Sequence, residues 1–296
     1  MSGITWAHPD TVGEALHTLA ANPTARLHGG GTGLLRSDPR EGLLVDLSRA
    51  GLGAITKEGG HLLVGATATL AELLERAAAV GGETHLLVQA LRETATPALR
   101  NRITVGGSVA MFPPWSGLIG PLVALDAEVE LVGGAGGTGD GATGDGAARA
   151  ESRRSVPIVE YLTENSSRRG TIVTAVRFAL YEDARYGWYR FVRLHFDYAS
   201  FSLAVVLRGG DTGSDGAATI HDARIVLVGT QNRFDRLNGV EERLSAGAPA
   251  AVSIADLPSA IPARNGFSSE YLTEVAIVQL QRILNEMTHD RTGGLR

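Results

Sequence analysis

Two glycine-rich segments of this chain, His28–Leu35 and Pro97–Ala110, hold the residues best suited to chemistry. Glycine lacks a Cβ, so its backbone reaches positive φ and its N–H can approach a phosphate oxygen closely. Neither segment has the spacing of a P-loop or of the dinucleotide-binding turn of a βαβ unit. Each segment alone is also typical of an ordinary tight turn, but the two together predict a site that grips a diphosphate.

The elements around the first segment show an α/β pattern. Thr11 and Thr69 each stand three residues before a glutamate, which is the capping-box arrangement at a helix start. The helices that they open are amphipathic, and the second is expected to stop at Gly81–Gly82. Short apolar runs at 43–47 and 62–64 are expected to be strands between helices.

The hydrophobic period changes at Ile172, and a different architecture is expected to begin nearby. The alternation of Ile172–Leu180 predicts a half-buried strand. The segments expected beyond it are two strands, Phe201–Leu207 and Ile220–Val228, and two helices, Phe234–Leu244 and Ser269–Met287. We therefore place a domain boundary at about residue 182, in a charged stretch.

Composition restricts the function. At 296 residues and 44% apolar content the chain can bury a substantial core, while a net charge of −5 and 5% aromatic residues argue against nucleic-acid binding. The chain has no cysteine, which excludes disulfides, thiol catalysis and thiolate metal sites. Because cysteine is the main ligand of iron–sulfur clusters, any such cluster must sit on another chain. The eight histidines show no close metal-ligand spacing.

No targeting or membrane-spanning segment is evident. The residues from Met1 to Trp6 open no apolar run of signal-peptide length, and no stretch is apolar enough to span a bilayer. We expect a cytoplasmic protein without membrane insertion.

The order of motifs resembles the FAD-binding medium subunit of the molybdenum hydroxylases, the family of xanthine dehydrogenase and carbon monoxide dehydrogenase. The resemblance rests on both glycine-rich segments and on further motifs, and it covers nearly the whole chain. These further motifs are Val64–Leu73, Pro121–Ala127, Arg154–Pro157, Thr171–Leu180, the stretch from Arg193 to Ala199, Ile261–Arg264 and Ser268–Tyr271.

The resemblance implies a fold and a domain organisation. The fold would be α+β (mixed α/β), with a two-lobed FAD-binding domain of the PCMH type and a smaller C-terminal domain of antiparallel sheet plus helices. The FAD-binding domain would span residues 1–181, with a small lobe over about 1–52 and a larger lobe over about 53–181. Residues 182–296 would form the C-terminal flavoprotein domain.

The resemblance also implies a cofactor site. In the family, one glycine-rich turn from each lobe wraps the pyrophosphate of FAD, and a diphosphate does need several N–H or hydroxyl donors at once. The implied cofactor contacts are Gly29, Gly30, Gly31, Thr32, Gly33, Leu34, Asn101, Thr104, Val105, Gly106, Gly107 and Ser108. No catalytic residue and no metal ligand is assigned on this chain.

Charged and titratable residues near these turns have two interpretations. Arg100 and Arg102 could neutralise phosphate charge, or they could be solvated or paired with a carboxylate. His28 could lie near the diphosphate and His195 near the flavin, or both could be structural.

The flavin ring needs a flat apolar wall. In related proteins a tyrosine at a fixed interval before an aspartate covers one ring face, and counting back from Asp197 places Trp188 there. Trp188 could equally be a core residue. The aspartate that contacts the FAD sugar or ribityl portion in the family is replaced here by Gly117. We therefore expect weaker FAD binding or a flavin that is held differently.

The preferred hypothesis is an FAD-carrying electron-transfer subunit of a molybdenum hydroxylase. A molybdopterin-binding large subunit would oxidise the substrate, a small subunit would relay electrons through [2Fe–2S] clusters, and the flavin of this chain would pass them to NAD, oxygen or a quinone. One alternative is a free-standing FAD-dependent dehydrogenase or oxidase of a small metabolite, suggested by the apolar loop Met111–Trp115. Another is a non-enzymatic scaffold with a decayed flavin site.

Overall fold

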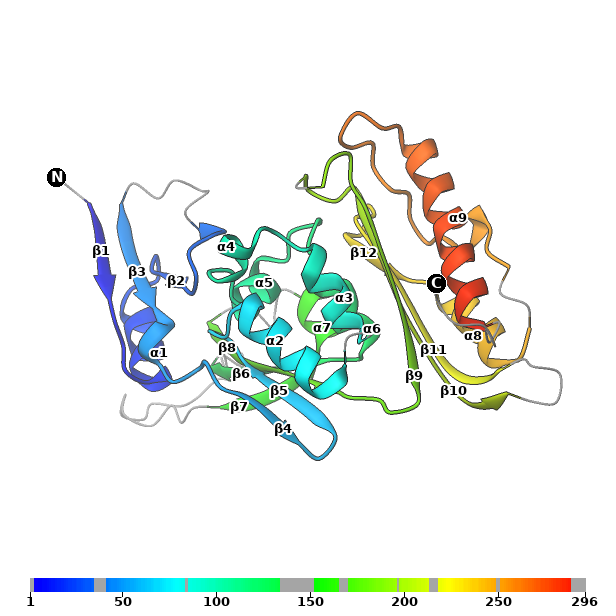
Figure 1. Cartoon of the computed structure of the whole chain (residues 1–296). Coiled ribbons are helices and arrows are strands. Elements are labelled where there is room, and N and C mark those ends of the chain that lie inside the picture. Colours follow the sequence, from blue (N-terminus) through cyan, green and yellow to red (C-terminus); the bar gives the residue numbers. More distant parts are fainter. Residues whose placement is uncertain are drawn as a thin grey trace, which may run out of the picture. The chain divides into compact units, whose positions relative to one another are not determined.

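The structure, a computed structural model, packs as two compact units, each assembled from separate stretches of sequence (Figure 1). It describes residues 3–34, 41–82, 85–133, 152–164, 170–195, 197–212, 218–248 and 251–288. Unit 1 comprises Met1–Leu73, Pro97–Met111 and Asp126–Phe178, and unit 2 comprises Leu74–Thr96, Phe112–Leu125 and Ala179–Arg296. The boundary at residue 182, which divides the chain into two continuous domains, stays a prediction.

A small parallel sheet with a helix against it forms the first part of unit 1. In sheet order its strands are β1 (Ile4–Ala7), β3 (Gly42–Asp46) and β2 (Arg26–His28), and α1 (Val12–Ala21) follows β1. The buried side chains of Ala15 and Val45 lie in the core between α1 and the sheet. The helix start at Thr11 is confirmed, because its hydroxyl accepts a bond from Glu14 N. The Glu14 carboxylate, however, accepts from Asp10 N rather than from Thr11 N.

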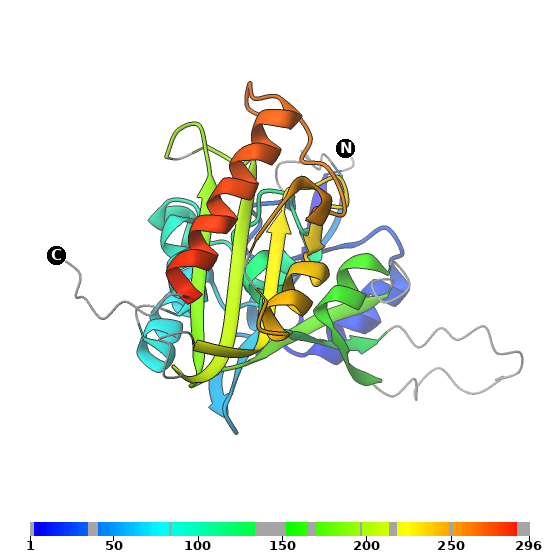
Figure 2. The ribbon, with the colours of Figure 1, turned by 90° about the vertical axis from the view of Figure 1, so that its right-hand side faces the viewer.

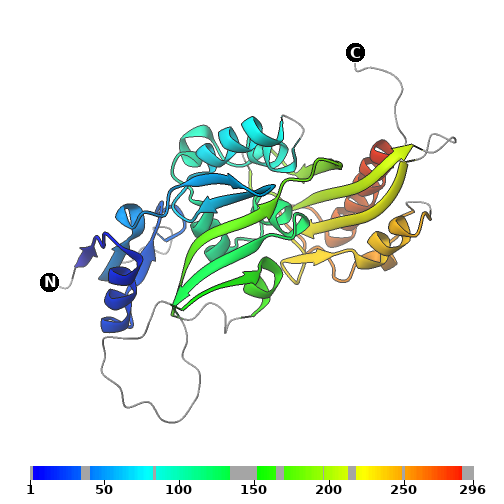
Figure 3. The same cartoon turned by 90° about the horizontal axis from the view of Figure 1, so that it is seen from below.

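A five-stranded sheet supplies the remaining strands of unit 1 (Figure 3). In sheet order these are β4 (Ile55–Glu58), β5 (His61–Gly65), β8 (Thr171–Ala179), β6 (Glu128–Gly133) and β7 (Arg153–Pro157). The strand predicted from Ile172 is therefore confirmed. Alternation predicts a strand and not its partners, and β8 pairs with β5 and β6 in the centre of this sheet.

Short helices connect these strands. They are η2 (Leu47–Arg49), α2 (Leu70–Gly81), α4 (Pro97–Arg100), α5 (Val105–Met111) and α7 (Ile158–Thr163), and α2 belongs to unit 2 from Leu74 onward. The capping box at the start of α2 is formed in both directions: Thr69 N donates to Glu72 Oε2 at 2.7 Å, and Glu72 N donates to Thr69 Oγ1 at 3.2 Å. The predicted end of α2 is also confirmed, since the helix ends at Gly81 and Gly82 has φ +76°.

Unit 2 is an antiparallel sheet with helices on both faces. In sheet order its strands are β12 (Phe234–Arg236), β11 (Ala218–Val228), β10 (Phe201–Thr212) and β9 (Ala184–Phe191). Helices α8 (Asn238–Ser245) and α9 (Ser269–Thr288), with the short η4 (Ile254–Asp256), pack on one face, and α3 (Leu86–Glu93) and α6 (Ile119–Ala124) pack on the other. In Figure 2, α9 (red) lies along β9 and β10. The α+β class is confirmed, and no described helix is long and apolar enough to cross a membrane.

The segment predicted as one helix over Phe234–Leu244 is instead a strand followed by a helix. Gly229 N donates to Arg233 O, and Arg233 has φ +75°, so the chain reverses at this point. Phe234 then pairs with Val228, and residues 234–236 add β12 to the sheet. The helix begins only at Asn238. Tertiary pairing therefore overrides the local helical spacing.

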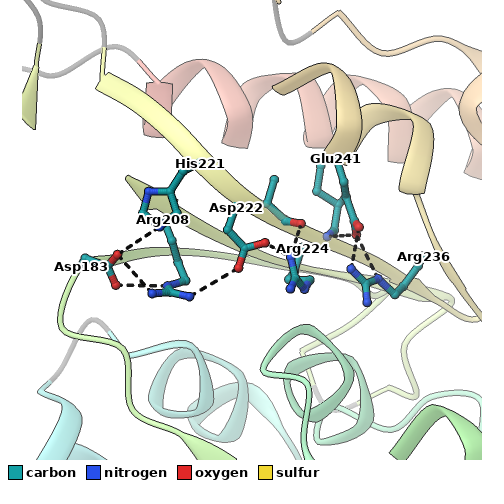
Figure 4. Close-up of polar contacts among 9 residues, drawn as sticks. Asp183, Arg208, His221, Asp222, Arg224, Arg236 and Glu241 are labelled. Atoms are coloured by element: carbon teal, nitrogen blue, oxygen red, sulfur yellow. Dashed lines mark hydrogen bonds and ion pairs between the residues drawn. The ribbon is translucent and has the colours of Figure 1, made fainter. Parts of the chain in front are cut away.

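Charged side chains form a row along this sheet (Figure 4). Arg208 of β10 lies between two carboxylates, with Nε 3.1 Å from Asp183 and Nη1 3.6 Å from Asp222. Glu241 of α8 is buried: its Oε1 accepts from Ile225 N at 2.7 Å and its Oε2 from Arg236 Nη2 at 2.6 Å. Because β12 ends at Arg236, Glu241 supplies the acceptor that a longer strand would offer to β11.

His85 makes the stability of unit 2 depend on pH. Its side chain is buried at the start of α3, where Nδ1 accepts a bond from Leu87 N at 3.3 Å. Burial lowers its pKa from 6.5 to about 4. Above pH 6.5 the folded and unfolded forms of His85 are both neutral, whereas between pH 6.5 and about 4 only the unfolded chain binds the proton. The free energy of unfolding therefore falls as the pH falls, by about 3 kcal/mol once the pH is below the pKa of the folded state.

A His85→Asn variant is expected to lose less stability than the wild type over that interval. Asparagine keeps an acceptor for the helix start but has no proton to gain. Urea unfolding at several pH values, followed by tryptophan fluorescence, measures the difference. His17→Asn, on the exposed side of α1, serves as the control and should keep the wild-type pH slope. Equal slopes for wild type and His85→Asn would contradict the assignment.

Candidate cofactor cleft

The two glycine-rich loops meet at one cleft within unit 1. Its volume is about 390 Å³. The lining residues are His28, Gly29, Gly30, Ser48, Gly53, Thr67, Thr69, Glu72, Asn101, Arg102 and Thr104. Four of the expected cofactor contacts are therefore brought together. A larger hollow of about 510 Å³ lies along α1 and contains none of them.

Glycines allow the two loops to touch. A Cβ on Gly30 would lie 1.4 Å from the carbonyl oxygen of Arg102, and a Cβ on Gly29 would lie 2.7 Å from Thr104 Oγ1. Gly31 follows at φ +74°, in the left-handed region that favours glycine. The guanidinium of Arg102 also donates to the Gly30 carbonyl at 3.4 Å. The close approach of the loops therefore requires glycine at these positions.

The two loops differ in how their amide groups are used. Within the described part of the chain, no protein group accepts a hydrogen bond from the N–H of Gly29, Gly30 or Gly31. In the second loop, Val105 N donates to Ala68 O at 2.9 Å and Gly106 N donates to Ala66 O at 2.8 Å. The first loop therefore retains backbone donors for an anion, and these two amides of the second loop are bonded within the protein.

The rest of the second loop is held by hydrogen bonds to Thr104. Gly107 N donates to Thr104 Oγ1 at 3.2 Å, and Ser108 Oγ donates to Thr104 O at 2.9 Å. A Cβ on Gly106 would lie 2.6 Å from Ala66 Cβ, so this glycine lets α5 pack closely on the segment after β5. Thr104 is therefore the residue around which this loop is organised.

Not every expected contact lies in the cleft lining. Gly33 packs against the other loop, since a Cβ there would lie 3.1 Å from Met111 Cε. Thr32 and Leu34 are half-buried and lie outside the lining set, as does Arg100.

The charges at the cleft are nearly balanced. Arg102 contributes a cation, and Glu72 contributes a carboxylate that is held by the Thr69 backbone and hydroxyl. His28 is the remaining titratable side chain of the lining, and its Nδ1 lies 3.6 Å from Asp46 Oδ1.

Trp188, the expected ring wall, lies on β9 of unit 2. Its indole is half-buried, and Nε1 donates to Glu93 Oε2 at 2.9 Å. A Cβ on Gly120 of α6 would lie 3.9 Å from the indole ring. Two residues along the strand, Arg190 donates to the carbonyls of His195 and Asp197 and so braces the loop after β9.

Close packing against Thr94 explains why position 117 is a glycine. A Cβ there would lie 1.9 Å from Thr94 Oγ1. The Thr94 hydroxyl is itself fixed, because it donates to Ala90 O at 2.7 Å. The structure therefore has no space for an aspartate at this point.

Several lining residues were missed by the sequence reasoning. Thr67, Thr69 and Glu72 fall in a motif that carries the family resemblance, and the capping box was a signal that this segment is held rigidly. Ser48 and Gly53 follow β3, and no pattern in the sequence distinguishes them from ordinary loop residues.

The chain is similar to known proteins. Residues 2–139 match the family described as the FAD binding domain in molybdopterin dehydrogenase. The 6-hydroxypseudooxynicotine dehydrogenase complex subunit alpha of Paenarthrobacter nicotinovorans is 27% identical, over 95% of this chain and 93% of that protein. The carbon monoxide dehydrogenase medium chain of Hydrogenophaga pseudoflava is 26% identical, over 94% of each chain. A solved carbon monoxide dehydrogenase from Hydrogenophaga pseudoflava aligns with a TM-score of 0.75 at 23% identity, over 96% of each chain.

Residues 2–139 thus carry an FAD-binding domain of the kind found in molybdopterin dehydrogenases. Over nearly its whole length the chain is similar to the medium chain of a carbon monoxide dehydrogenase and to the medium subunit of a nicotine 6-hydroxylase. Its cofactor is FAD, and it is part of an oxidoreductase.

Proposed function

We propose that the cleft of unit 1 holds the diphosphate of FAD and that the chain is the electron-transfer subunit of its complex. Electrons would arrive from a [2Fe–2S] centre on a small partner subunit, after substrate oxidation on a molybdopterin-binding large subunit. They would leave to an external acceptor such as NAD, oxygen or a quinone. FAD, when bound, supplies the redox chemistry, while the protein supplies binding and orientation.

The proposed site is supported by a difference between the backbone amides of the two loops. Gly29, Gly30 and Gly31 have amides that no described protein group uses, next to the cation of Arg102. Thr104 and Asn101 of the second segment also line the cleft. We propose that the first loop donates to the diphosphate and that the second, through Val105, Gly106, Gly107 and Ser108, fixes the distance between the loops. Thr32, Gly33 and Leu34 would hold the first loop in place.

Trp188 remains the proposed stacking partner of the flavin ring because of its place in the family motif. The bond from its indole to Glu93 would hold the ring plane in one orientation. Such a residue positions the flavin without taking part in proton transfer.

The partner proposal is supported by the composition of the chain and by its relatives. With no cysteine, the chain lacks the usual ligands of an iron–sulfur cluster. The names of its relatives describe a medium chain or one subunit of a complex. An iron–sulfur relay would therefore have to come from another chain.

Purification of the tagged chain from its native cells tests this function. The expected result is a yellow complex that releases FAD on denaturation and contains two further subunits, one with iron and one with molybdenum. A yellow chain that purifies alone and oxidises an organic substrate would favour the free-standing flavoprotein. A colourless chain that does not bind added FAD would favour the decayed scaffold.

A further inference from the structure

The three parallel strands of the small sheet bring titratable side chains together at their carboxyl ends. The register pairs His28 of β2 with Asp46 of β3, and His8 directly follows β1, whose last residue pairs with Val45. His28 Nδ1 lies 3.6 Å from Asp46 Oδ1, and His8 Nδ1 lies 3.8 Å from Asp46 Oδ2. Ligands of open α/β sheets commonly bind at this end of the strands.

His28 lies between this carboxylate and the cleft. Its side chain is only 12% exposed, and it forms a T-shaped pair with Trp6, with ring centroids 5.0 Å apart. Nδ1 is buried beside Asp46 and has no hydrogen-bond partner among the described residues, while the ring lines the cleft with Gly29 and Gly30. The second ring nitrogen, Nε2, is therefore the atom left for a ligand.

Asp46 is held in its ionised form. Burial alone would raise its pKa, but the hydrogen bonds from Ser48 and the proximity of His28 lower it below the usual value. The bond from Ser48 N to Asp46 Oδ1 is 2.9 Å.

The fixed charges of the cleft lining do not balance the charge of a diphosphate. Arg102 and Glu72 cancel each other, whereas a diphosphate bridge carries two negative charges. The charged and titratable groups around His28 are His8, which follows β1, Asp46 at the end of β3, and, in the same cleft lining, Glu72 from α2 and Arg102 from the segment after α4. The lining of the cleft would therefore gain net positive charge if His28 were protonated.

We propose that His28, positioned by Asp46, binds the FAD diphosphate as an imidazolium, so that FAD binding takes up a proton from solvent. This inference rests on the proposed cofactor site. It makes His28 a ligand residue and Asp46 its positioning residue. By linkage, FAD is held more tightly at lower pH within the range where imidazoles titrate.

Calorimetric titration of FAD into the FAD-free chain, in buffers of different ionisation enthalpy, measures this proton uptake directly. The wild type is expected to take up a fraction of a proton near neutral pH. Its FAD dissociation constant should rise about tenfold between about pH 6 and about pH 8.5. His28→Gln should abolish both effects. Asp46→Asn, which keeps an acceptor for Ser48 N, should reduce the uptake.

His17→Gln on α1 is the matched control and should behave as the wild type. Circular dichroism confirms that each variant is folded, and the Asp46→Asn result decides the outcome if His28→Gln does not fold. Undiminished proton uptake in the folded variants, with FAD still bound, would overturn the role of His28 and leave the cofactor site intact. Failure of the wild type to bind FAD at any pH would instead overturn the site itself.

Discussion

The Gly30→Ala variant is expected to lose FAD and to unfold at a lower temperature than the wild type. The added Cβ would lie 1.4 Å from the carbonyl oxygen of Arg102, so the backbone of one loop must move. Overpacking usually costs 1–3 kcal/mol, and a collision with backbone belongs at the upper end, at about 3 kcal/mol. The same free energy, if lost from FAD binding, corresponds to an affinity about a hundredfold weaker.

Quenching of flavin fluorescence measures the affinity, and thermal unfolding with and without FAD measures the stability. The matched control is Gly3→Ala in the same unit, where an added Cβ has no neighbour within 4 Å. This control should bind FAD and unfold like the wild type. If Gly30→Ala binds FAD as tightly as the control, then contact between the loops is not required for the cofactor site.

The Glu241→Ala variant is expected to have the largest effect on unit 2, a loss of about 3 kcal/mol in the free energy of unfolding. Removing the carboxylate leaves Ile225 N and the Arg236 guanidinium without the acceptor that now holds both. The cost of leaving a buried donor unsatisfied adds to the cost of leaving a partly buried charge uncompensated. Urea unfolding monitored by the fluorescence of Trp115 and Trp188 reports on this unit.

Two further variants separate these contributions. Glu242→Ala removes the neighbouring carboxylate, which is exposed, and should leave stability within about 0.5 kcal/mol of the wild type. Glu241→Gln keeps an oxygen acceptor for Ile225 N but removes the charge opposite Arg236, so it should fall between the other two. A Glu241→Ala protein as stable as Glu242→Ala would show that the edge of β11 does not depend on this side chain.

Local signals in the sequence predicted the parts of the fold that depend on local physics. Thr69 and Glu72 satisfy each other's backbone groups within one turn, so their pattern alone identifies the start of α2. The α9 segment carries a long apolar stripe, and the helix extends over Ser269–Thr288 as expected. The left-handed Gly82 likewise marks the end of α2.

The remaining features depend on contacts between residues far apart in the chain. Phe234 has helical spacing with the residues after it, but pairing with Val228 places it in a strand. The sequence shows that Gly30 is suited to a turn, whereas its contact with Arg102 across the cleft is visible only in the structure. The role of Glu241 was also not predictable, because it depends on where β12 stops.

The packing of Gly117 against Thr94 constrains how this protein can change over time. An aspartate introduced at 117 alone would collide with a hydroxyl only 1.9 Å from its Cβ. A smaller residue at position 94 would have to come first, and that change would remove the bond to Ala90 O. The two sites are therefore epistatic, and an evolutionary path to an acidic side chain at 117 must pass through position 94 first.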